Sequence, residues 1–128
     1  MRLLLDTHAF LWWIEDSPRL SRTARRAISS PANECVFSVA SAWEMAVKLS
    51  IRKLKLDAPL GRFLPEQLAA NGFVAHGIDL RHFARVAGLP FHHRDPFDRL
   101  LVAQALEDKL AIVSPDRVFS RYGVRRVW

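Results

Sequence analysis

With 128 residues, half of them hydrophobic, and a net charge of +6, the chain suits a single domain over residues 1–128 and a polyanionic partner such as RNA. No stretch approaches the ~20 uninterrupted apolar residues of a membrane span, and Asp6 interrupts the first apolar run too early for a signal peptide. Cys35 is the only cysteine, which excludes an internal disulfide and a thiolate zinc site and favours a cytoplasmic protein.

Short apolar runs alternate with segments of helical spacing along the whole chain. Strands are expected at 2–5, around 36–37, and at 73–78, 111–113 and 124–127. Helices are expected at 7–14, 21–29, 40–49, 61–70, 81–87, 96–108 and 118–122. The segment 50–60 is basic and irregular, and 90–94 is expected to be a loop. This alternation predicts an α/β fold with a mostly parallel sheet covered on both faces.

Four acidic residues occupy positions that this fold would bring together: Asp6, Glu44, Asp98 and Asp116. Asp6 ends the apolar run 3–5, and Asp116 follows the apolar run 110–113. Ligands of open parallel sheets bind just beyond the carboxyl ends of the strands. Carboxylates gathered there repel one another unless a divalent cation joins them, so the pattern predicts a magnesium or manganese site and phosphate chemistry.

The aspartates also have ordinary structural explanations. Asp6 and Asp116 could each cap the helix that follows, by accepting a bond from a free backbone N–H. Asp95 could cap the helix that begins at Pro96, with Asp98 in its first turn facing the helix dipole. These caps explain each residue separately, whereas a metal site requires that the acids converge.

Glu44 lies four residues before Lys48, which is the favourable order for a surface ion pair. Its neighbours Ala40, Trp43 and Val47 indicate that this part of the helix is substantially buried. A carboxylate near a buried face needs a partner, which either Lys48 or a metal ion would supply.

Other polar residues flank the expected site. The hydroxyls of Thr7, Ser38 and Ser114 could hydrogen-bond a metal-held water or steer a carboxylate, or could simply cap and turn the chain. The adjacent His92 and His93 are expected to point apart into solvent rather than to bind a metal.

Four motifs together resemble a PIN-domain protein, in particular the VapC-like toxins of bacterial toxin–antitoxin pairs. They are Leu-Leu-Leu-Asp-Thr-His at 3–8, Ser-Ala-Trp-Glu at 41–44, Arg-Asp-Pro-Phe-Asp-Arg at 94–99 and Ser-Pro-Asp at 114–116. The resemblance covers essentially the whole chain. It implies a three-layer α/β/α sandwich around a central, mostly parallel sheet of about five strands. It also implies a ribonuclease that depends on Mg²⁺ or Mn²⁺ and is inhibited by a cognate antitoxin. A homodimer is a further expectation from the resemblance.

The family's acidic quartet carries over onto four positions: Asp6, Glu44, Asp98 and Asp116. The resemblance assigns Asp6 and Asp98 as direct metal ligands and Asp116 as the holder of a ligating water or a second metal. Glu44 would orient or deprotonate the attacking water. The family's hydroxyl falls on Ser114, and Asp95 is an extra acid that serves as a helix cap or supports the site.

Basic residues around the site are expected to hold the RNA backbone, namely Arg94, Arg99, Arg117 and the stretch 52–55. Trp12 and Trp13 cannot easily face inward together, so one of them is expected to fill a subunit interface.

Three other functions are compatible with parts of this pattern. A phosphatase of the haloacid dehalogenase type also places an Asp after its first strand, but it needs a second Asp two positions later, where this chain has His8. A non-catalytic nucleic-acid or partner-binding module would share the fold without needing four converging acids. A solitary RNA-processing nuclease would share the chemistry and lack the antitoxin.

Overall fold

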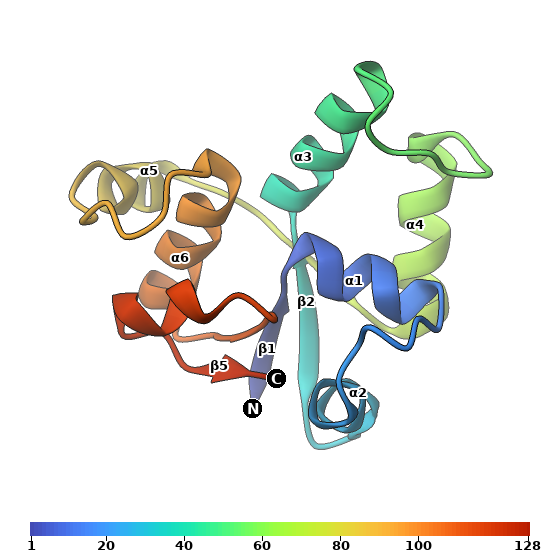
Figure 1. Ribbon diagram of the computed structural model, residues 1–128, viewed down its shortest axis with the longest axis horizontal. Coiled ribbons are helices and arrows are strands. Elements are labelled where there is room, and N and C mark those ends of the chain that lie inside the picture. Colours follow the sequence, from blue (N-terminus) through green and yellow to red (C-terminus); the bar gives the residue numbers. More distant parts are fainter.

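A computed structural model describes all residues 1–128 and shows one five-stranded sheet with helices on both faces (Figure 1). Every pair of neighbouring strands is parallel. In spatial order the strands are β3 (Val74–His76), β2 (Glu34–Ser38), β1 (Arg2–Leu5), β4 (Ala111–Val113) and β5 (Arg126–Val127). The helices are α1 (Thr7–Ile14), α2 (Arg22–Ser29), α3 (Val39–Ser50), α4 (Leu60–Asn71), α5 (Leu80–Ala87), α6 (Pro96–Asp108) and the 3₁₀ helix η1 (Arg117–Tyr122).

The two faces of the sheet bury separate apolar clusters, because successive side chains of a strand point to opposite faces. In β1, Leu3 and Leu5 are fully buried and join the cluster that contains residues of α1 and α2. Leu4, between them, belongs to the other cluster, to which α6 contributes more residues than any other element. Helices α1, α2 and α4 accordingly lie on one side of the sheet, with α5 and α6 on the other (Figure 1). This arrangement confirms the three-layer α/β/α sandwich.

The strand order reverses direction next to β1. The chain passes from β1 outward through β2 to β3, then returns to the other side of β1 to form β4 and β5. Leu5 at the end of β1 pairs with Phe37 on one side and Val113 on the other. The crevice outside the carboxyl ends of such strands is the usual ligand site of open α/β sheets. Asp6 follows Leu5 at this point.

The expected elements are all present, with small differences in length. Helix α6 has the bounds expected from the sequence, whereas the strands expected at 73–78 and 124–127 are shorter. None of the helices has the length and apolar character needed to cross a membrane.

Candidate metal centre

Asp6 combines a capping bond with a place in the expected site. Its Oδ1 accepts a hydrogen bond of 2.7 Å from the backbone N–H of Ala9, so the residue is the N-cap of α1. The residue is only 5% exposed. Burial raises the pKa of Asp6 to about 6, although hydrogen bonds from Ser114 and Ala9 oppose this rise. A carboxyl buried at a strand end is therefore costly to ionise in the metal-free protein.

Both oxygens of the buried Glu44 carboxylate have partners. The Thr7 hydroxyl donates to Oε1 over 2.6 Å, and the Lys48 ammonium lies 2.6 Å from Oε2. Lys48 is thus the partner that a buried carboxylate requires. Thr7, one residue after Asp6, ties α1 to α3 through this bond. The expected ion pair and the expected burial are both present.

The expectation that Trp43 is buried was wrong. Trp43 is 58% exposed, and its ring packs edge-on against Phe97 of α6 with 4.9 Å between ring centroids. The inward face of α3 is instead formed by Ala40, Glu44 and Met45, together with Ser41. Helix α3 has two stripes of apolar residues at helical spacing, and only one of them faces the core.

Asp98 experiences the charge of the whole group of acids. Asp95 caps α6 by accepting a 3.0 Å bond from the Asp98 backbone N–H, which places the Asp98 carboxyl in the first turn. Burial and, after it, the charges of Asp95, Asp6, Glu44 and Asp116 together raise the pKa of Asp98 to about 8. Because charge repulsion falls off with distance, this pattern indicates that the four expected acids share one site.

Asp116 uses its two carboxylate oxygens differently. Oδ1 accepts a 2.9 Å bond from the backbone N–H of Val118 and so caps η1. Oδ2 lies 2.9 Å from Nε2 of His93, and the same nitrogen lies 3.1 Å from Asp98 Oδ2. Asp6 and Asp116 each use one carboxylate oxygen to cap a helix, and the second oxygen takes no part in the cap. Each residue can therefore cap a helix and also belong to the acidic cluster.

His93 was not expected in this site. The two adjacent histidines do point apart, but only His92 turns away, to the ring of Tyr122. His93 turns toward the acids. His93 stands two residues before Asp95, the N-cap of α6. Because the loop must return to the site to begin α6, this position could have indicated the contact.

The hydroxyls divide into two roles. Ser114 accepts a 3.0 Å bond from the Asp116 backbone N–H, and its hydroxyl lowers the pKa of Asp6, so it lies within the acidic cluster. Ser38 caps α3 and donates to the buried Gln104 side chain. Ser38 is therefore committed to holding α3 and α6 together.

Arg99 does not have the surface position expected of an RNA-binding residue. It is 6% exposed. Its guanidinium donates to the carbonyl oxygens of Pro90, Val86 and Leu89 at 2.9, 3.1 and 3.3 Å. These bonds hold it inside the protein, which contradicts a role in contacting phosphates. The guanidinium also stacks on the ring of Phe91 at 4.1 Å.

The other basic candidates are exposed. Arg94 and Arg117 lie close in sequence to Asp95 and Asp116. The basic stretch 52–55 lies at the far end of α3, whose 12 residues span roughly 18 Å from the carboxyl end of β2 (Figure 1). RNA would have to extend along the length of α3 to reach this stretch.

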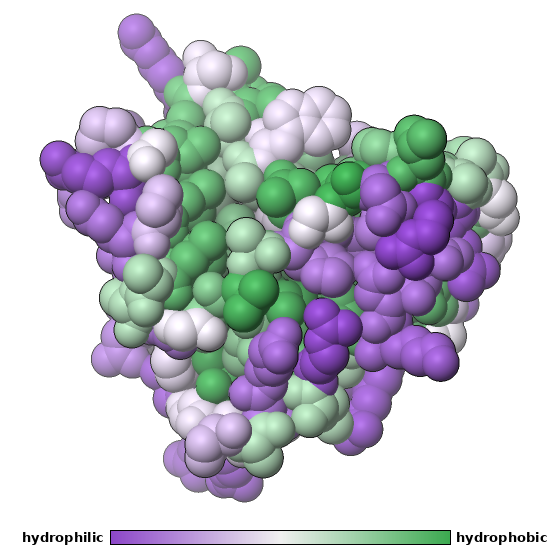
Figure 2. Space-filling view, turned by 180° about the vertical axis from the view of Figure 1, so that it is seen from behind, coloured by the Kyte–Doolittle hydropathy of each residue, from purple (hydrophilic) through white to green (hydrophobic).

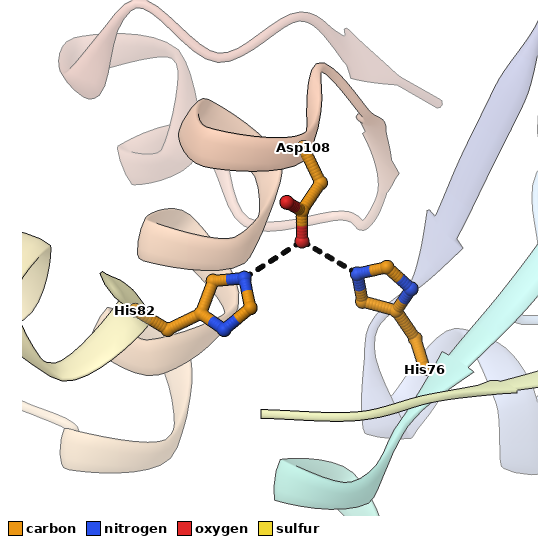
Figure 3. Close-up of side chains that lie close together, drawn as sticks. All are labelled: His76, His82 and Asp108. Atoms are coloured by element: carbon orange, nitrogen blue, oxygen red, sulfur yellow. Dashed lines mark hydrogen bonds and ion pairs between the residues drawn. The ribbon is translucent and has the colours of Figure 1, made fainter. Parts of the chain in front are cut away.

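A second group of histidines and acid lies beside a shallow pocket of about 490 Å³. His76 and His82 approach Asp108 Oδ2 from two sides, each at 2.7 Å (Figure 3). The backbone N–H of Asp79 donates to His82 Nδ1, so the proton of the neutral ring lies on Nε2 and leaves no lone pair for a metal. Arg81 pairs with Asp108 Oδ1 at 3.1 Å.

The charges of this second group are already compensated. Burial raises the pKa of Asp108, but hydrogen bonds from His76 and His82 outweigh it and bring the pKa to about 2. The group therefore fastens α5 and the end of β3 to α6. It is an ion-pair cluster rather than a cation site.

The donor set of the first cluster fits a hard divalent cation. Carboxylate oxygens are the ligands that Mg²⁺ and Mn²⁺ prefer. Such oxygens are supplied by three acids that lie at helix starts along one edge of the sheet, Asp6, Asp98 and Asp116. The raised pKa values of Asp6 and Asp98 reflect a burial and repulsion cost that a bound cation would offset.

Comparisons with known proteins agree with this arrangement. Ribonuclease VapC22 of Mycobacterium tuberculosis (strain ATCC 25618 / H37Rv) is 34% identical over 116 residues, which cover 90% of this chain and 87% of that protein. A chain in the crystal structure of VapBC2 from Rickettsia felis, bound to a DNA fragment, matches with a TM-score of 0.69 and 14% identity over 100% of both chains. A chain of DNA-bound VapBC from Salmonella typhimurium matches with a TM-score of 0.67 and 18% identity, over 98% of this chain and 96% of that one. The PIN domain family matches residues 3–125, so the chain belongs to the PIN domain family as a VapC-like member.

Proposed function

We propose that this protein is a ribonuclease that hydrolyses RNA phosphodiesters with a Mg²⁺ or Mn²⁺ ion and acts as the toxin of a toxin–antitoxin pair. The observation that carries the proposal is the gathering of Asp6, Glu44, Asp98 and Asp116 at the carboxyl edge of the sheet, where burial and then the neighbouring acids raise the pKa of Asp98 to about 8. Binding of nucleic acid alone does not require four converging acids. A cation that acts on a phosphate needs carboxylate ligands, which this cluster would supply.

The roles follow from what each side chain contacts. Asp6, Asp98 and Asp116 would hold the cation. When bound, the cation would make a water molecule more acidic and offset charge on the phosphoryl oxygens. Glu44 is held by Thr7 and Lys48, and from that position it would orient or deprotonate the attacking water.

Replacing Asp6 by asparagine tests the metal dependence of cleavage. Asn keeps the size of the side chain and an oxygen for the Ala9 cap, but it removes one anionic ligand. We expect cleavage of a mixed single-stranded and structured RNA pool to fall by at least about 100-fold, with an unchanged circular dichroism spectrum. Wild-type cleavage should require Mn²⁺ or Mg²⁺ and stop in EDTA.

Retained cleavage in a folded Asp6→Asn protein would refute the assigned site. Specific Mn²⁺ binding without cleavage of any RNA in the pool would favour a narrow substrate range. An absence of both would favour a non-catalytic binding module.

The exposed arginines beside the acids are proposed to hold the RNA backbone. We expect affinity for RNA, measured with the inactive Asp6→Asn protein, to fall steeply as salt is added. Arg94→Ala and Arg117→Ala should each lower the salt slope by about 1, whereas Arg22→Ala on α2 should leave it unchanged. An RNA affinity of the Asp6→Asn protein that does not change with salt concentration would argue against phosphate contacts.

Exposed apolar surface supports a protein partner. Large hydrophobic side chains are exposed at Val39 and Trp43 of α3 and at Leu80 and Phe83 of α5. The face seen from behind carries apolar areas between hydrophilic ones (Figure 2). Large exposed apolar patches mark interaction sites. The VapBC structures named above are complexes of two proteins, which supports an antitoxin partner for this chain.

A homodimer remains a proposal. Trp12 and Trp13, expected to provide an interface residue, are both half-buried: Trp12 packs near Trp128, and Trp13 bonds Asn71. Trp43 is more exposed and is the better interface candidate. The molar mass in solution, measured for the wild type and Trp43→Glu, would decide this point.

A further inference from the structure

His93 contacts the acidic cluster through one ring nitrogen, and its other nitrogen fixes the proton position. The backbone N–H of Asp95 donates to His93 Nδ1 over 3.1 Å. A ring nitrogen that accepts a hydrogen bond carries no proton, so the proton of the neutral imidazole lies on Nε2. His93 Nε2 is therefore a donor to Asp116 Oδ2 at 2.9 Å, and it lies 3.1 Å from Asp98 Oδ2.

This tautomer excludes His93 as a metal ligand. An imidazole binds a metal through a nitrogen lone pair, and a protonated Nε2 has none. One nitrogen of His93 and one oxygen each of Asp98 and Asp116 lie within 4.8 Å of one another. Of these three groups, only the two carboxylates retain lone pairs for a cation. A site with oxygen ligands alone agrees with the preference for Mg²⁺ or Mn²⁺.

We propose that His93 is a positioning residue, which holds the Asp116 carboxylate beside Asp98 by donating its Nε2–H to Asp116 Oδ2 while it lies 3.1 Å from Asp98 Oδ2. The proposal rests on the metal-dependent function proposed above. Without this donor, the Asp116 carboxylate would be free to turn away from Asp98. With it, each carboxylate keeps further lone pairs for a cation.

The backbone around His93 is anchored independently of the acids, as positioning requires. The His93 backbone N–H donates to the Tyr122 hydroxyl over 2.8 Å, and that hydroxyl donates to the Pro90 carbonyl over 2.9 Å. The buried Arg99 guanidinium binds the same Pro90 carbonyl. These bonds fix the loop and so hold the imidazole next to the acids.

The proton position is directly measurable. Long-range ¹H–¹⁵N NMR spectra of metal-free protein with ¹⁵N-labelled histidine should show His93 as the Nε2–H tautomer. His93→Ala identifies the signal. A neutral ring protonated on Nδ1 would overturn the proposal, because Nε2 would then be free to ligate a metal.

Mn²⁺ titration by calorimetry tests the positioning role without relying on cleavage. We expect His93→Ala to weaken Mn²⁺ binding by about 10–100-fold. His93→Gln, which keeps a side-chain N–H at a similar reach, should recover most of this loss. His92→Ala is the matched control, because the neighbouring ring packs against Tyr122, and it should bind Mn²⁺ like the wild type.

Two outcomes would overturn the proposal. Mn²⁺ binding that is unchanged or tighter in His93→Ala would show that the donor does not assemble the site. An equal loss in His93→Ala and His93→Gln would identify the imidazole itself as a ligand. If the wild type bound no Mn²⁺, the proposed function would fail instead, and the NMR measurement would still decide the hydrogen-bond arrangement.

Discussion

Replacing Asp98 by asparagine is expected to abolish RNA cleavage and at the same time to stabilise the metal-free protein. The substitution removes a proposed metal ligand, so cleavage should fall by at least about 100-fold. It also removes a carboxyl whose pKa is raised to about 8, first by burial and then by Asp95, Asp6, Glu44 and Asp116. Because this carboxyl is costly to ionise, a neutral amide of the same shape should increase the stability of the metal-free protein.

The sign of the pH dependence follows from that raised pKa. Between the unfolded pKa, about 3.9, and the folded value of about 8, the folded protein holds a proton that the unfolded chain has lost. The stability contributed by this group is fully present below the unfolded pKa and is lost as pH rises through about 8. Asp6, with a pKa of about 6, adds a smaller loss of the same sign.

Thermal unfolding in EDTA at several pH values measures this effect. Asp98→Asn should be more stable than the wild type by on the order of 1–3 kcal/mol at pH 8. This figure is below the full linkage value, because the side chain is 25% exposed and screened by solvent. The difference should shrink as the pH approaches about 4.

The exposed Asp57 provides the control for this comparison. Asp57→Asn should change neither cleavage nor the pH profile of stability. A wild-type protein that is equally stable in EDTA at pH 5 and pH 8, or an Asp98→Asn protein that still cleaves RNA, would contradict the crowded-acid description of the site.

Replacing the buried Arg99 by methionine is expected to destabilise the protein by about 2–4 kcal/mol. The substitution removes a charged donor from three carbonyl oxygens, at Val86, Leu89 and Pro90. Val86 and Pro90 each keep one other donor, the Leu89 backbone N–H and the Tyr122 hydroxyl. Arg99→Lys should recover only part of the loss, because one ammonium does not reproduce the planar fork of the guanidinium. Urea unfolding of the metal-free protein measures both variants.

Arg94 is the control, since it is exposed in the same loop. Arg94→Met should change the free energy of unfolding by less than about 0.5 kcal/mol. Arg99→Met should also weaken Mn²⁺ binding, because the loop that contains His93 loses one of its two side-chain bonds at the Pro90 carbonyl. A change of less than 1 kcal/mol in Arg99→Met would show that water replaces the guanidinium and that the loop does not depend on it.

The sequence was most informative where local chemistry determines structure. Helix α6 begins with Asp95 as its cap and Pro96 in its first turn, and the capping bond from Asp98 is the one expected. The four acids could be assigned to one site because parallel strands bring their carboxyl ends to one edge. Those predictions depend on neighbours in the chain or on the fold class alone.

The errors concern residues whose surroundings come from distant segments. Trp43 belongs to a helix with two apolar stripes, and spacing alone does not say which one faces the core. Arg99 follows an acid in the first turn of a helix and resembles a solvated charge, but carbonyl groups from residues 86–90 enclose it. His93 lies in a loop, whose direction depends on bonds to Tyr122 and Asp95.

Calorimetric titration of the purified, partner-free protein with Mn²⁺ near pH 7 tests the central claim most directly, in two buffers of different ionisation enthalpy. We predict specific binding with release of protons, because a cation would displace the proton that Asp98 holds at this pH, given its pKa of about 8. Binding should be lost or greatly weakened in Asp6→Asn and Asp98→Asn and unchanged in Asp57→Asn. Absence of Mn²⁺ and Mg²⁺ binding, or equal binding by wild type and both quartet variants, would contradict a metal centre built from these acids.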